Sequence, residues 1–375
     1  MSENAQKPRI RFKGFSDAWE QRKLGDTTQI IMGQSPDGST YSDFPTDYIL
    51  VQGNADLENG WVKPRIWTTQ KTKYAVAGDL IMSVRAPAGS MGKTAYNVVL
   101  GRGVAAIKGN EFIFQVLTKM DLEGFWKKLS SGSTFESLNS DNIINANINL
   151  PANLEQDKIG SFFENIDNLI TLHQCESCKI VVAVKCAFVA RNLSNRTDSW
   201  EQRKFEEIAV RSSAICSDAN LPRVEYEDIV SGTGRLNKDI YAKQSSKSGI
   251  AFHQGDVLYG KLRPYLQNWL LPTFDGLAVG DFWVLQPQNA DSSFLYRLIQ
   301  SRQFDEVANQ STGTKMPRAD WKLVSKTVFS IPSNISEQAA IGKYFTALDN
   351  LITLHQRQLE KLKNIKSALL EKMFV

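Results

Sequence analysis

The amino-acid sequence repeats itself once, and this internal repeat constrains the fold more than any other feature. Trp19–Lys23, which reads Trp-Glu-Gln-Arg-Lys, returns as Trp200–Lys204. The eight residues Asp167–Gln174 return unchanged as Asp349–Gln356. Most of the sequence between these shared pieces differs between the two copies. Matched frames that carry different inserts place two different surfaces in related positions, so the repeat predicts a protein that reads two unlike things.

The stretch after each insert predicts a long helix. Pro151 and Pro332 each close an extended segment, because proline disfavours helical conformation in the residue before it. Asn153 and Asn334 follow at positions typical of helix capping. Apolar residues then recur at alternating four- and three-residue steps, as in helices that pack lengthwise on one another. We favour an antiparallel pair over two separate core helices.

The predicted seam between these two helices has matching positions in both copies. It consists of Ile166, Ile170, His173 and Ile180 in the first helix and Leu348, Ile352, His355, Leu359, Leu362 and Leu369 in the second. The central copy departs in its second half, where β-branched residues from Ile180 to Val184 lower the helix propensity. We expect that stretch to remain helical, with a weaker seam.

The two inserts predict mixed α/β domains with several strands and turns. Strand-like runs include Ile49–Gln52, Leu80–Val84, Val257–Tyr259 and Phe282–Leu285. The expected fold is α+β: two mixed α/β domains related by pseudo-two-fold symmetry and separated by two long antiparallel helices packed as a coiled coil. The expected parts are a connecting segment at 1–23, domains at 24–152 and 196–333, and helices at 153–195 and 334–375.

Composition narrows the class of protein without deciding its function. With 42% hydrophobic and 22% charged residues, the chain has the balance of a soluble globular protein. We expect a cytoplasmic protein with no membrane partner, because there is no apolar run of about 18 residues and no secretory signal. The net charge of +4 permits a nucleic-acid partner but does not demand one.

One segment is similar to part of a phosphate-binding loop. Gly89–Thr94 ends in Gly-Lys-Thr, but the glycine that the motif requires five residues before Gly92 is Pro87. Proline has no backbone N–H to offer a phosphate. A nucleotide hydrolase that uses residues 87–94 is therefore the less favoured alternative.

A second candidate is a metal site that begins at His173, Cys175 and Cys178. A zinc site needs further ligands, and the equivalent His355 has no cysteines beside it. We interpret these residues as packing positions on a helix and expect no metal site. The sequence also lacks the motifs for adenine methylation, dinucleotide binding and the common hydrolases. We therefore expect no catalytic residues in this chain.

The polar loops of the inserts are the remaining candidates for function. They contain arginine, lysine and glutamine, which read base edges, and serine and threonine, which hold phosphates. The DNA-binding candidates are Gln34, Ser35, Arg85, Lys93, Ser131, Ser133 and Thr134 in the first insert and Lys261, Arg263, Tyr265, Thr312, Thr314, Lys315 and Arg318 in the second.

Over nearly its whole length the chain resembles the specificity subunit of type I restriction–modification systems. The resemblance rests on the tandem layout, on Trp-Glu-Gln-Arg-Lys in each half, and on a Gly-Asp turn followed by an arginine in each insert. The segment Gly255–Tyr265 and the pattern from Leu348 to the C-terminal Leu-Leu-Glu-Lys-Met-Phe add to it.

The resemblance implies a non-catalytic, DNA-binding subunit. Each target-recognition domain would read one half of a split site in double-stranded DNA. The partners would be two methylation subunits, which bring S-adenosylmethionine, and two restriction subunits, which use ATP and Mg. No cofactor would bind to this chain. A helix of about 30 residues is about 45 Å long, enough to hold two readers one DNA turn, about 34 Å, apart. A helical adaptor that never touches bases is the other alternative.

Overall fold

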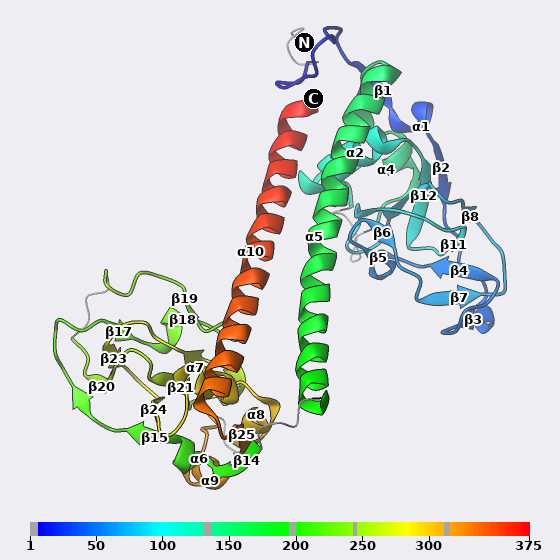
Figure 1. The fold of residues 1–375 in the computed structure, drawn as a ribbon. Coiled ribbons are helices and arrows are strands. Elements are labelled where there is room, and N and C mark those ends of the chain that lie inside the picture. Colours follow the sequence, from blue (N-terminus) through cyan, green and yellow to red (C-terminus); the bar gives the residue numbers. More distant parts are fainter. Residues whose placement is uncertain (1–6, 131–136, 195–199, 243–245, 311–315) are drawn as a thin grey trace. The chain divides into compact units, whose positions relative to one another are not determined.

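The computed structural model describes residues 7–130, 137–194, 200–242, 246–310 and 316–375, and of 175–194 it describes the backbone alone. The chain forms two compact units (Figure 1). Unit 1 comprises Met1–Cys178 and His355–Val375, and unit 2 comprises Lys179–Leu354. The division passes through both long helices. The units are therefore described one at a time.

Unit 1 is built on two β-sheets with short helices beside them. The six-stranded sheet has the order β2 (Gln29–Met32), β12 (Val104–Lys108), β9 (Leu80–Ser83), β10 (Met91–Lys93), β6 (Trp61–Val62) and β5 (Leu57–Glu58). The five-stranded sheet has the order β3 (Tyr41–Ser42), β7 (Ile66–Thr68), β4 (Tyr48–Val51), β11 (Val98–Leu100) and β8 (Tyr74–Ala75). The helices are α1 (Leu24–Thr27), α2 (Glu111–Leu122), α3 (Phe125–Ser130) and α4 (Ser140–Ile144).

Strand β9 explains why this sequence forms a layered domain. Side chains alternate between the two faces of a strand. Leu80 and Met82 therefore point into a core shared with the helices, while Ile81 points into a second core between the sheets. A strand that is buried on both faces reads as a continuous apolar run, and this is the pattern by which the sequence predicts it.

Unit 2 repeats this plan with smaller sheets. One sheet has the order β15 (Ala209–Ser212), β24 (Phe282–Pro287), β21 (Val257–Gly260) and β22 (Trp269–Leu270). The other has the order β16 (Ile215–Cys216), β20 (Gly249–Phe252), β23 (Gly276–Ala278) and β17 (Arg223–Val224), and β18 (Ile229–Val230) pairs with β19 (Arg235–Leu236). The helices are α6 (Phe205–Ile208), α7 (Ser292–Leu298), α8 (Arg302–Ala308) and α9 (Trp321–Lys326). All four predicted strand-like runs are strands.

The repeated Trp-Glu-Gln-Arg-Lys motif has the same structural role in both units. In unit 1 it forms β1 (Glu20–Lys23), which pairs antiparallel with β13 (Asn147–Leu150). In unit 2 it forms β14 (Trp200–Lys204), which pairs antiparallel with β25 (Val328–Pro332). Each pair joins the entry of a domain to the strand that precedes its long helix. The motif thus ties the two ends of each insert together.

The two long helices are α5 (Asn153–Ser194) and α10 (Ile335–Met373). The β-branched stretch 180–184 lies inside α5, so the prediction of a helix there is confirmed. Neither these helices nor any other that the structure describes combines the length and the apolar character of a membrane span. The predicted cap is correct for α10, where Ser336 N donates to Asn334 Oδ1 at 2.8 Å. It is wrong for α5, because Asn153 is itself the first helical residue.

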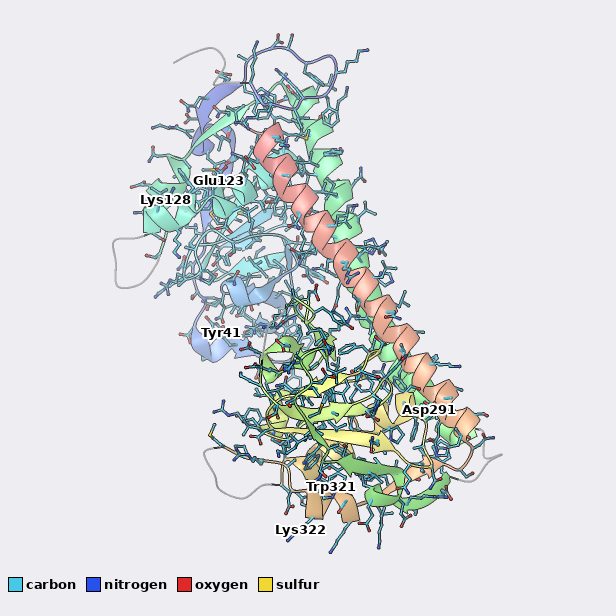
Figure 2. All side chains as sticks on the ribbon, turned by 90° about the vertical axis from the view of Figure 1, so that its left-hand side faces the viewer. Tyr41, Glu123, Lys128, Asp291, Trp321 and Lys322 are labelled. Carbon is cyan, nitrogen blue, oxygen red and sulfur yellow. The ribbon has the colours of Figure 1, made fainter. Side chains whose placement is uncertain are left out.

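A buried glutamine anchors the start of each long helix. Gln156 Nε2 donates to the carbonyl of the proline before α5 at 3.0 Å, and Gln338 Nε2 does the same before α10 at 2.8 Å. Their amide oxygens accept from Asn110 Nδ2 at 3.0 Å and from the backbone N–H of Asp291 at 2.9 Å. Asp291 lies beside the first turns of α10 (Figure 2). Each glutamine therefore joins a helix to its own domain.

Within unit 1 the first half of α5 and the last half of α10 run antiparallel (Figure 1). Asp167 Oδ1 meets Lys366 Nζ at 2.6 Å, and the rings of His173 and His355 have their centroids 5.8 Å apart. Because the later residue of α5 meets the earlier residue of α10, the helices run in opposite directions. The equivalent histidines of the repeat thus lie at a helix–helix contact.

The predicted seam positions follow the buried stripe of the helices. Ile166 is buried in the core of unit 1, and Ile170 and Leu369 pack against that core. The partly buried positions of α10 include Leu348, Ile352, His355, Leu359 and Leu362. The side chain of Ile180 is outside the described residues.

Gly342 of α10 allows a close approach that can be tested through stability. A Cβ there would lie 2.6 Å from Ser293 Cβ and 2.8 Å from its backbone carbon, so α10 or α7 would have to shift. Helix propensity alone predicts that Gly342→Ala stabilises the chain by about 1 kcal/mol. We expect the free energy of unfolding to fall by about 1–3 kcal/mol instead, because the added methyl group would overpack the contact with Ser293.

Urea unfolding of the two proteins measures this difference. The exposed neighbouring residue provides the control, and Lys343→Ala should change the free energy of unfolding by less than about 0.5 kcal/mol. A stabilised Gly342→Ala protein would show that the close approach does not constrain the helix.

Candidate nucleic-acid interface

Matched turns lead into the central strands of the two domains. Gly78 and Gly255 have φ values of 96° and 92°, in the left-handed region that favours glycine. Asp79 and Asp256 follow, and each carboxylate accepts the backbone N–H three residues earlier at 2.9 Å. These turns start β9 and β21 in the same way. The segments that follow the strands, 84–90 and 261–268, are here named reading loop 1 and reading loop 2.

Each reading loop is joined to a segment much later in the chain. In unit 1 the N–H of Leu138 donates to the carbonyl of Val84 at 2.8 Å, and in unit 2 the N–H of Ala319 donates to the carbonyl of Lys261 at 2.8 Å. These equivalent hydrogen bonds show that the two inserts match in three-dimensional structure as well as in sequence. One loop and one distant segment form a continuous surface in each domain.

The backbone of reading loop 2 is held from behind. The hydroxyl of Tyr226 accepts from the N–H of Leu262 at 2.9 Å and donates to the carbonyl of Asp281 at 2.6 Å. Burial raises the pKa of Tyr226 above its usual value, so the hydroxyl keeps its proton and its donor role. The N–H of Arg263 donates to Pro317 O at 2.7 Å, and Arg263 has a φ of 48°. Such a conformation persists in a non-glycine residue only when its surroundings impose it.

Four of the predicted DNA-binding side chains come together at reading loop 2. Asp281 holds two of them, with Lys261 Nζ at 3.4 Å and Arg318 Nη2 at 3.0 Å. Arg263 is exposed and Tyr265 is 55% exposed. Neither of their side chains makes a hydrogen bond or an ion pair within the described part of the chain. The surface therefore offers an exposed guanidinium and an aromatic ring beside two oriented cations.

Reading loop 1 presents different chemistry from the same frame. Counted from the matched Gly-Asp turns, Arg85 aligns with Leu262, and the buried Ala88 takes the position of the exposed Tyr265. Arg263 itself aligns with an alanine, so the arginines of the two loops are offset by one residue. Arg85 is exposed, and this loop carries no aromatic residue.

Gln34 and Ser35 lie near reading loop 1. The N–H of Arg102 donates to Ser35 Oγ at 3.2 Å, and the N–H of Val84 donates to the carbonyl of Gly103 at 2.8 Å. The short turn at 101–103 therefore contacts both segments. Gln34 is exposed there. The structure brings these two residues and Arg85 to neighbouring positions, as an extended polar surface would need.

Three matched positions distinguish the two surfaces. In unit 2 they hold the charged group Lys261, Asp281 and Arg318. In unit 1 the same backbone bonds place Val84, Gly103 and Ser137 there. One domain thus carries an ionic network where the other is neutral. Sequence reasoning missed Asp281 and Tyr226, because their bonds to the loop cross tens of residues.

Lys93 does not lie on the surface with the other candidates. Its ammonium donates to Glu111 Oε2 at 2.8 Å and lies 4.9 Å from the ring centroids of both Trp61 and Phe114. Only 11% of its side chain is exposed. It belongs to strand β10, and no helix starts there, which also argues against a phosphate-binding loop at 87–94.

The remaining DNA-binding candidates are outside the described residues, so they stay predictions. They are Ser131, Ser133, Thr134, Thr312, Thr314 and Lys315. The described residues contain no group of three or more His, Cys, Asp or Glu residues that could hold a metal ion. The side chains of Cys175 and Cys178 are not among them.

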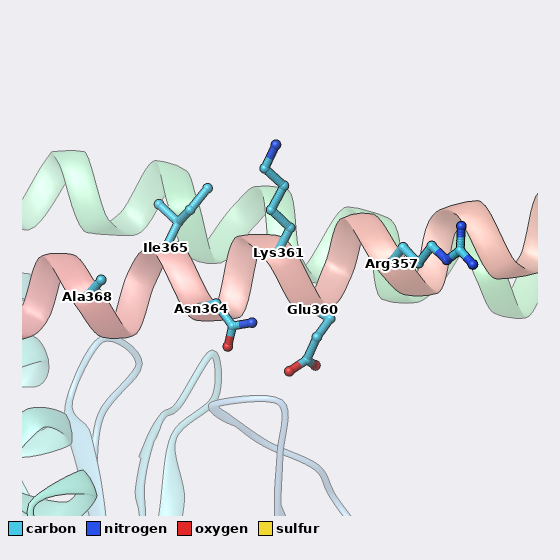
Figure 3. Close-up of a pocket in the computed structure, with 6 residues that line it drawn as sticks. All are labelled: Arg357, Glu360, Lys361, Asn364, Ile365 and Ala368. Atoms are coloured by element: carbon cyan, nitrogen blue, oxygen red, sulfur yellow. The ribbon is translucent and has the colours of Figure 1, made fainter. Parts of the chain in front are cut away.

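A shallow hollow lies on the exposed side of α10 (Figure 3). Its volume is about 490 Å³, and it is lined by Arg357, Glu360, Lys361, Asn364, Ile365 and Ala368. None of these residues belongs to the predicted seam or to the predicted DNA-binding set. The hollow is open and lined by one helix, so it does not have the form of an enclosed ligand site.

Comparison with known proteins identifies the family. The model of the type I restriction modification DNA specificity domain matches residues 16–180 and again residues 198–364. The chain therefore belongs to this family and contains two specificity domains in tandem. It is a specificity protein of the type I restriction–modification class.

Two curated relatives have the same character. The MjaX type I restriction enzyme specificity subunit of Methanocaldococcus jannaschii is 32% identical over 177 residues, which are 44% of this chain and 41% of that protein. The EcoDI specificity subunit of Escherichia coli is 24% identical over 197 residues, 50% of this chain and 44% of that protein. The alignments thus span less than half of either relative.

Solved structures support the fold over nearly the whole chain. The S subunit of a type I restriction–modification system from M. genitalium has a TM-score of 0.64 at 15% identity, covering 98% of this chain and 99% of that one. A chain from a study of the assembly and conformational transition of the type I system has a TM-score of 0.52 at 15% identity, covering 95% and 97%. At this identity the likeness concerns the fold alone.

Removal of the Tyr226 hydroxyl should have a measurable effect on stability. Tyr226→Phe leaves the Leu262 N–H and the Asp281 carbonyl without their partner, so it should lower the free energy of unfolding by about 1–3 kcal/mol. Tyr241 is 68% exposed, and Tyr241→Phe should have an effect below about 0.5 kcal/mol. Denaturant unfolding of both proteins measures the difference, and equal small losses would contradict the proposed support of reading loop 2.

Proposed function

We propose that this chain reads the DNA sequence for a type I restriction–modification complex, with each specificity domain recognising one half of a bipartite site. The observation that carries this proposal is the contrast between the reading loops. Identical turns and backbone bonds present the charged group Lys261, Asp281 and Arg318 in one domain and neutral residues in the other. A frame that is kept while its surface changes is what two different half-sites require.

Reading loop 2 has suitable groups for both parts of DNA recognition. The exposed guanidinium of Arg263 can donate two hydrogen bonds to a guanine edge in the major groove. Lys261 and Arg318 supply positive charge for phosphates, which fixes the position of the protein on the duplex. Asp281 orients both cations and makes no favourable contact with phosphate itself. The ring of Tyr265 offers a flat apolar surface beside them.

The long helices are proposed as the docking site for two methylation subunits. The identical segments Asp167–Gln174 and Asp349–Gln356 each expose two leucines, Leu169 and Leu172 in one and Leu351 and Leu354 in the other. Exposed apolar side chains that recur with unchanged neighbours suit two copies of one partner. The same helices would set the gap between the half-sites.

The chemistry of the complex is assigned to the partners. The methylation subunits would bring S-adenosylmethionine, two restriction subunits would use ATP and Mg, and this chain would bind no cofactor and catalyse no step. The adaptor alternative is less favoured, because it gives no role to the exposed Arg263 and Tyr265. A hydrolase at 87–94 is less favoured, because Lys93 is bonded to Glu111.

Sequencing of N6-methyladenine tests the proposal. Cells that express the methylation subunits with this chain should methylate one bipartite motif, and cells without the chain should not. Exchange of residues 24–152 for another first insert should change only one half of the motif. An unchanged methylome in both comparisons would rule out a DNA-reading role.

Arg263 provides a sharper test of reading loop 2. Arg263→Ala should cost about 1–3 kcal/mol of discrimination at one or two positions of a single half-site. Binding of wild-type and mismatched duplexes by the assembled complex measures it. Arg302 is exposed on α8 of the same unit and pairs with Glu306 at 2.6 Å, so Arg302→Ala is the matched control. A uniform loss for all duplexes would make Arg263 a phosphate contact.

A further inference from the structure

A continuous chain of hydrogen bonds crosses unit 1 from the β-sheet domain that carries reading loop 1 to both long helices. Lys93 Nζ of β10 donates to Glu111 Oε2 of α2 at 2.8 Å. Gln115 Nε2, also on α2, donates to Glu111 Oε1 at 2.8 Å and to Asp167 Oδ2 of α5 at 2.8 Å. Lys366 Nζ of α10 donates to Asp167 Oδ1 at 2.6 Å. These five residues are named the polar chain.

The polar chain is buried and balanced in charge. Gln115 is fully buried, and the two lysines and two carboxylates are between 11% and 24% exposed. Buried polar groups need partners, and an unpaired buried charge is costly. The amide of Gln115 has two N–H donors, so it can link two carboxylates, and each carboxylate has one lysine. Displacement of any element would leave one of these groups without its partner.

In unit 2 the equivalent aspartate pairs with a cation from a different element. With the 182-residue offset of the repeat, Asp349 corresponds to Asp167 and Arg297 corresponds to Gln115. Arg297 Nη1 meets Asp349 Oδ2 at 2.7 Å. The position that corresponds to Lys366 is Val184 in the sequence. Among the described side chains each aspartate therefore pairs with one cation, which comes from the domain itself in unit 2 and from the opposite helix in unit 1.

Apolar packing alone does not fix the position of the first domain along the helices. Hydrophobic burial is non-directional, whereas a charge-assisted hydrogen bond of 2.6 Å has a narrow geometry. A polar residue in an apolar helix seam is known to select one register of pairing. Lys366 lies between Leu362 and Leu369 of the seam, so it can set the register of α5 and α10 in unit 1.

We propose that Lys366, acting through Asp167 and Gln115, is the positioning residue that makes this protein selective for one gap length between its half-sites. This inference rests on the proposed DNA-reading function. One base pair corresponds to about 3.4 Å of rise and about 35° of rotation, since a turn holds about 10–10.5 base pairs. A reader that slides or turns by that amount on its helices accepts a different gap.

The test uses the full chain with its methylation subunits and N6-methyladenine sequencing. Lys366→Met keeps the length and the apolar stem of the side chain but leaves Asp167 without its cation. The gap ratio is defined as methylation at sites whose gap is one base pair longer or shorter, divided by methylation at sites with the wild-type gap. It should rise about tenfold in this variant, as expected for one lost charge-assisted bond. An unchanged ratio in an assembled complex overturns the proposal.

The control lies one turn away on the same helix. Lys363 is exposed and outside the seam, and Lys363→Met removes the same charge from the protein. It should leave the gap ratio at its wild-type value. A change as large as that of Lys366→Met would assign the effect to net charge and overturn the proposal.

A second variant separates positioning from simple charge balance. Gln115→Arg combined with Lys366→Val installs in unit 1 the solution that unit 2 uses, with the cation supplied by the domain. We expect this protein to assemble even if Lys366→Met does not, and its gap ratio to remain raised, because no bond crosses between the helices. Recovery of the wild-type ratio would show that Lys366 supplies charge alone and would overturn the proposal.

The methylation pattern of the wild-type complex distinguishes failure of the proposed function from failure of the proposed role of Lys366. If wild-type complexes methylate no bipartite motif, the proposed function fails. If they methylate one motif at one gap and all variants keep that gap, only the role of Lys366 fails.

Discussion

The first domain depends on apolar contacts with the last residues of the chain. Leu370, Met373 and Phe374 of the C-terminal segment are buried in the same core as Trp19 and Phe163. The rings of Trp19 and Phe374 pack edge to face at 6.0 Å. Full burial of each such side chain is worth roughly 1.5–3 kcal/mol, so unit 1 needs both ends of the sequence. The equivalent Trp200 is 36% exposed in unit 2. The same contacts hold the last turn of α10 beside the first turns of α5 within unit 1.

The proposed function depends on small differences on a frame that the two domains share. The Gly-Asp turns, the strands β9 and β21 and the bonds that hold the reading loops are common to both. The side chains at the ends of those bonds are not. This arrangement separates folding from recognition, because the backbone bonds need no particular side chain. A reading surface can therefore change without loss of the domain.

Much of the architecture could be predicted from local patterns, and the errors have identifiable causes. Strands buried on both faces and a seam with a heptad period are visible in any window of ten to twenty residues. The cap at Asn153 was wrong by one residue, because backbone bonds to Ala152 start α5 there. The sequence groups Lys93 with the surface cations, although its exposure is decided by Trp61 of β6 and by Glu111 and Phe114 of α2. Tyr226 and Asp281 give no local signal, because Tyr226 lies 36 residues from its partner Leu262 and Asp281 lies 37 residues from its partner Arg318.

The sequence by itself determined that the chain has two copies of one frame, two long helices and two unlike inserts. These features depend on order and periodicity along the chain, which the sequence displays directly. Only the tertiary structure decided which cations are buried in ion pairs and which are exposed to a ligand. Lys93 and Arg263 are both basic residues of the inserts, yet one is buried against a carboxylate and the other is exposed on a strained turn. The physical reason is that burial and ion pairing are set by residues distant in sequence, and folding alone brings them together.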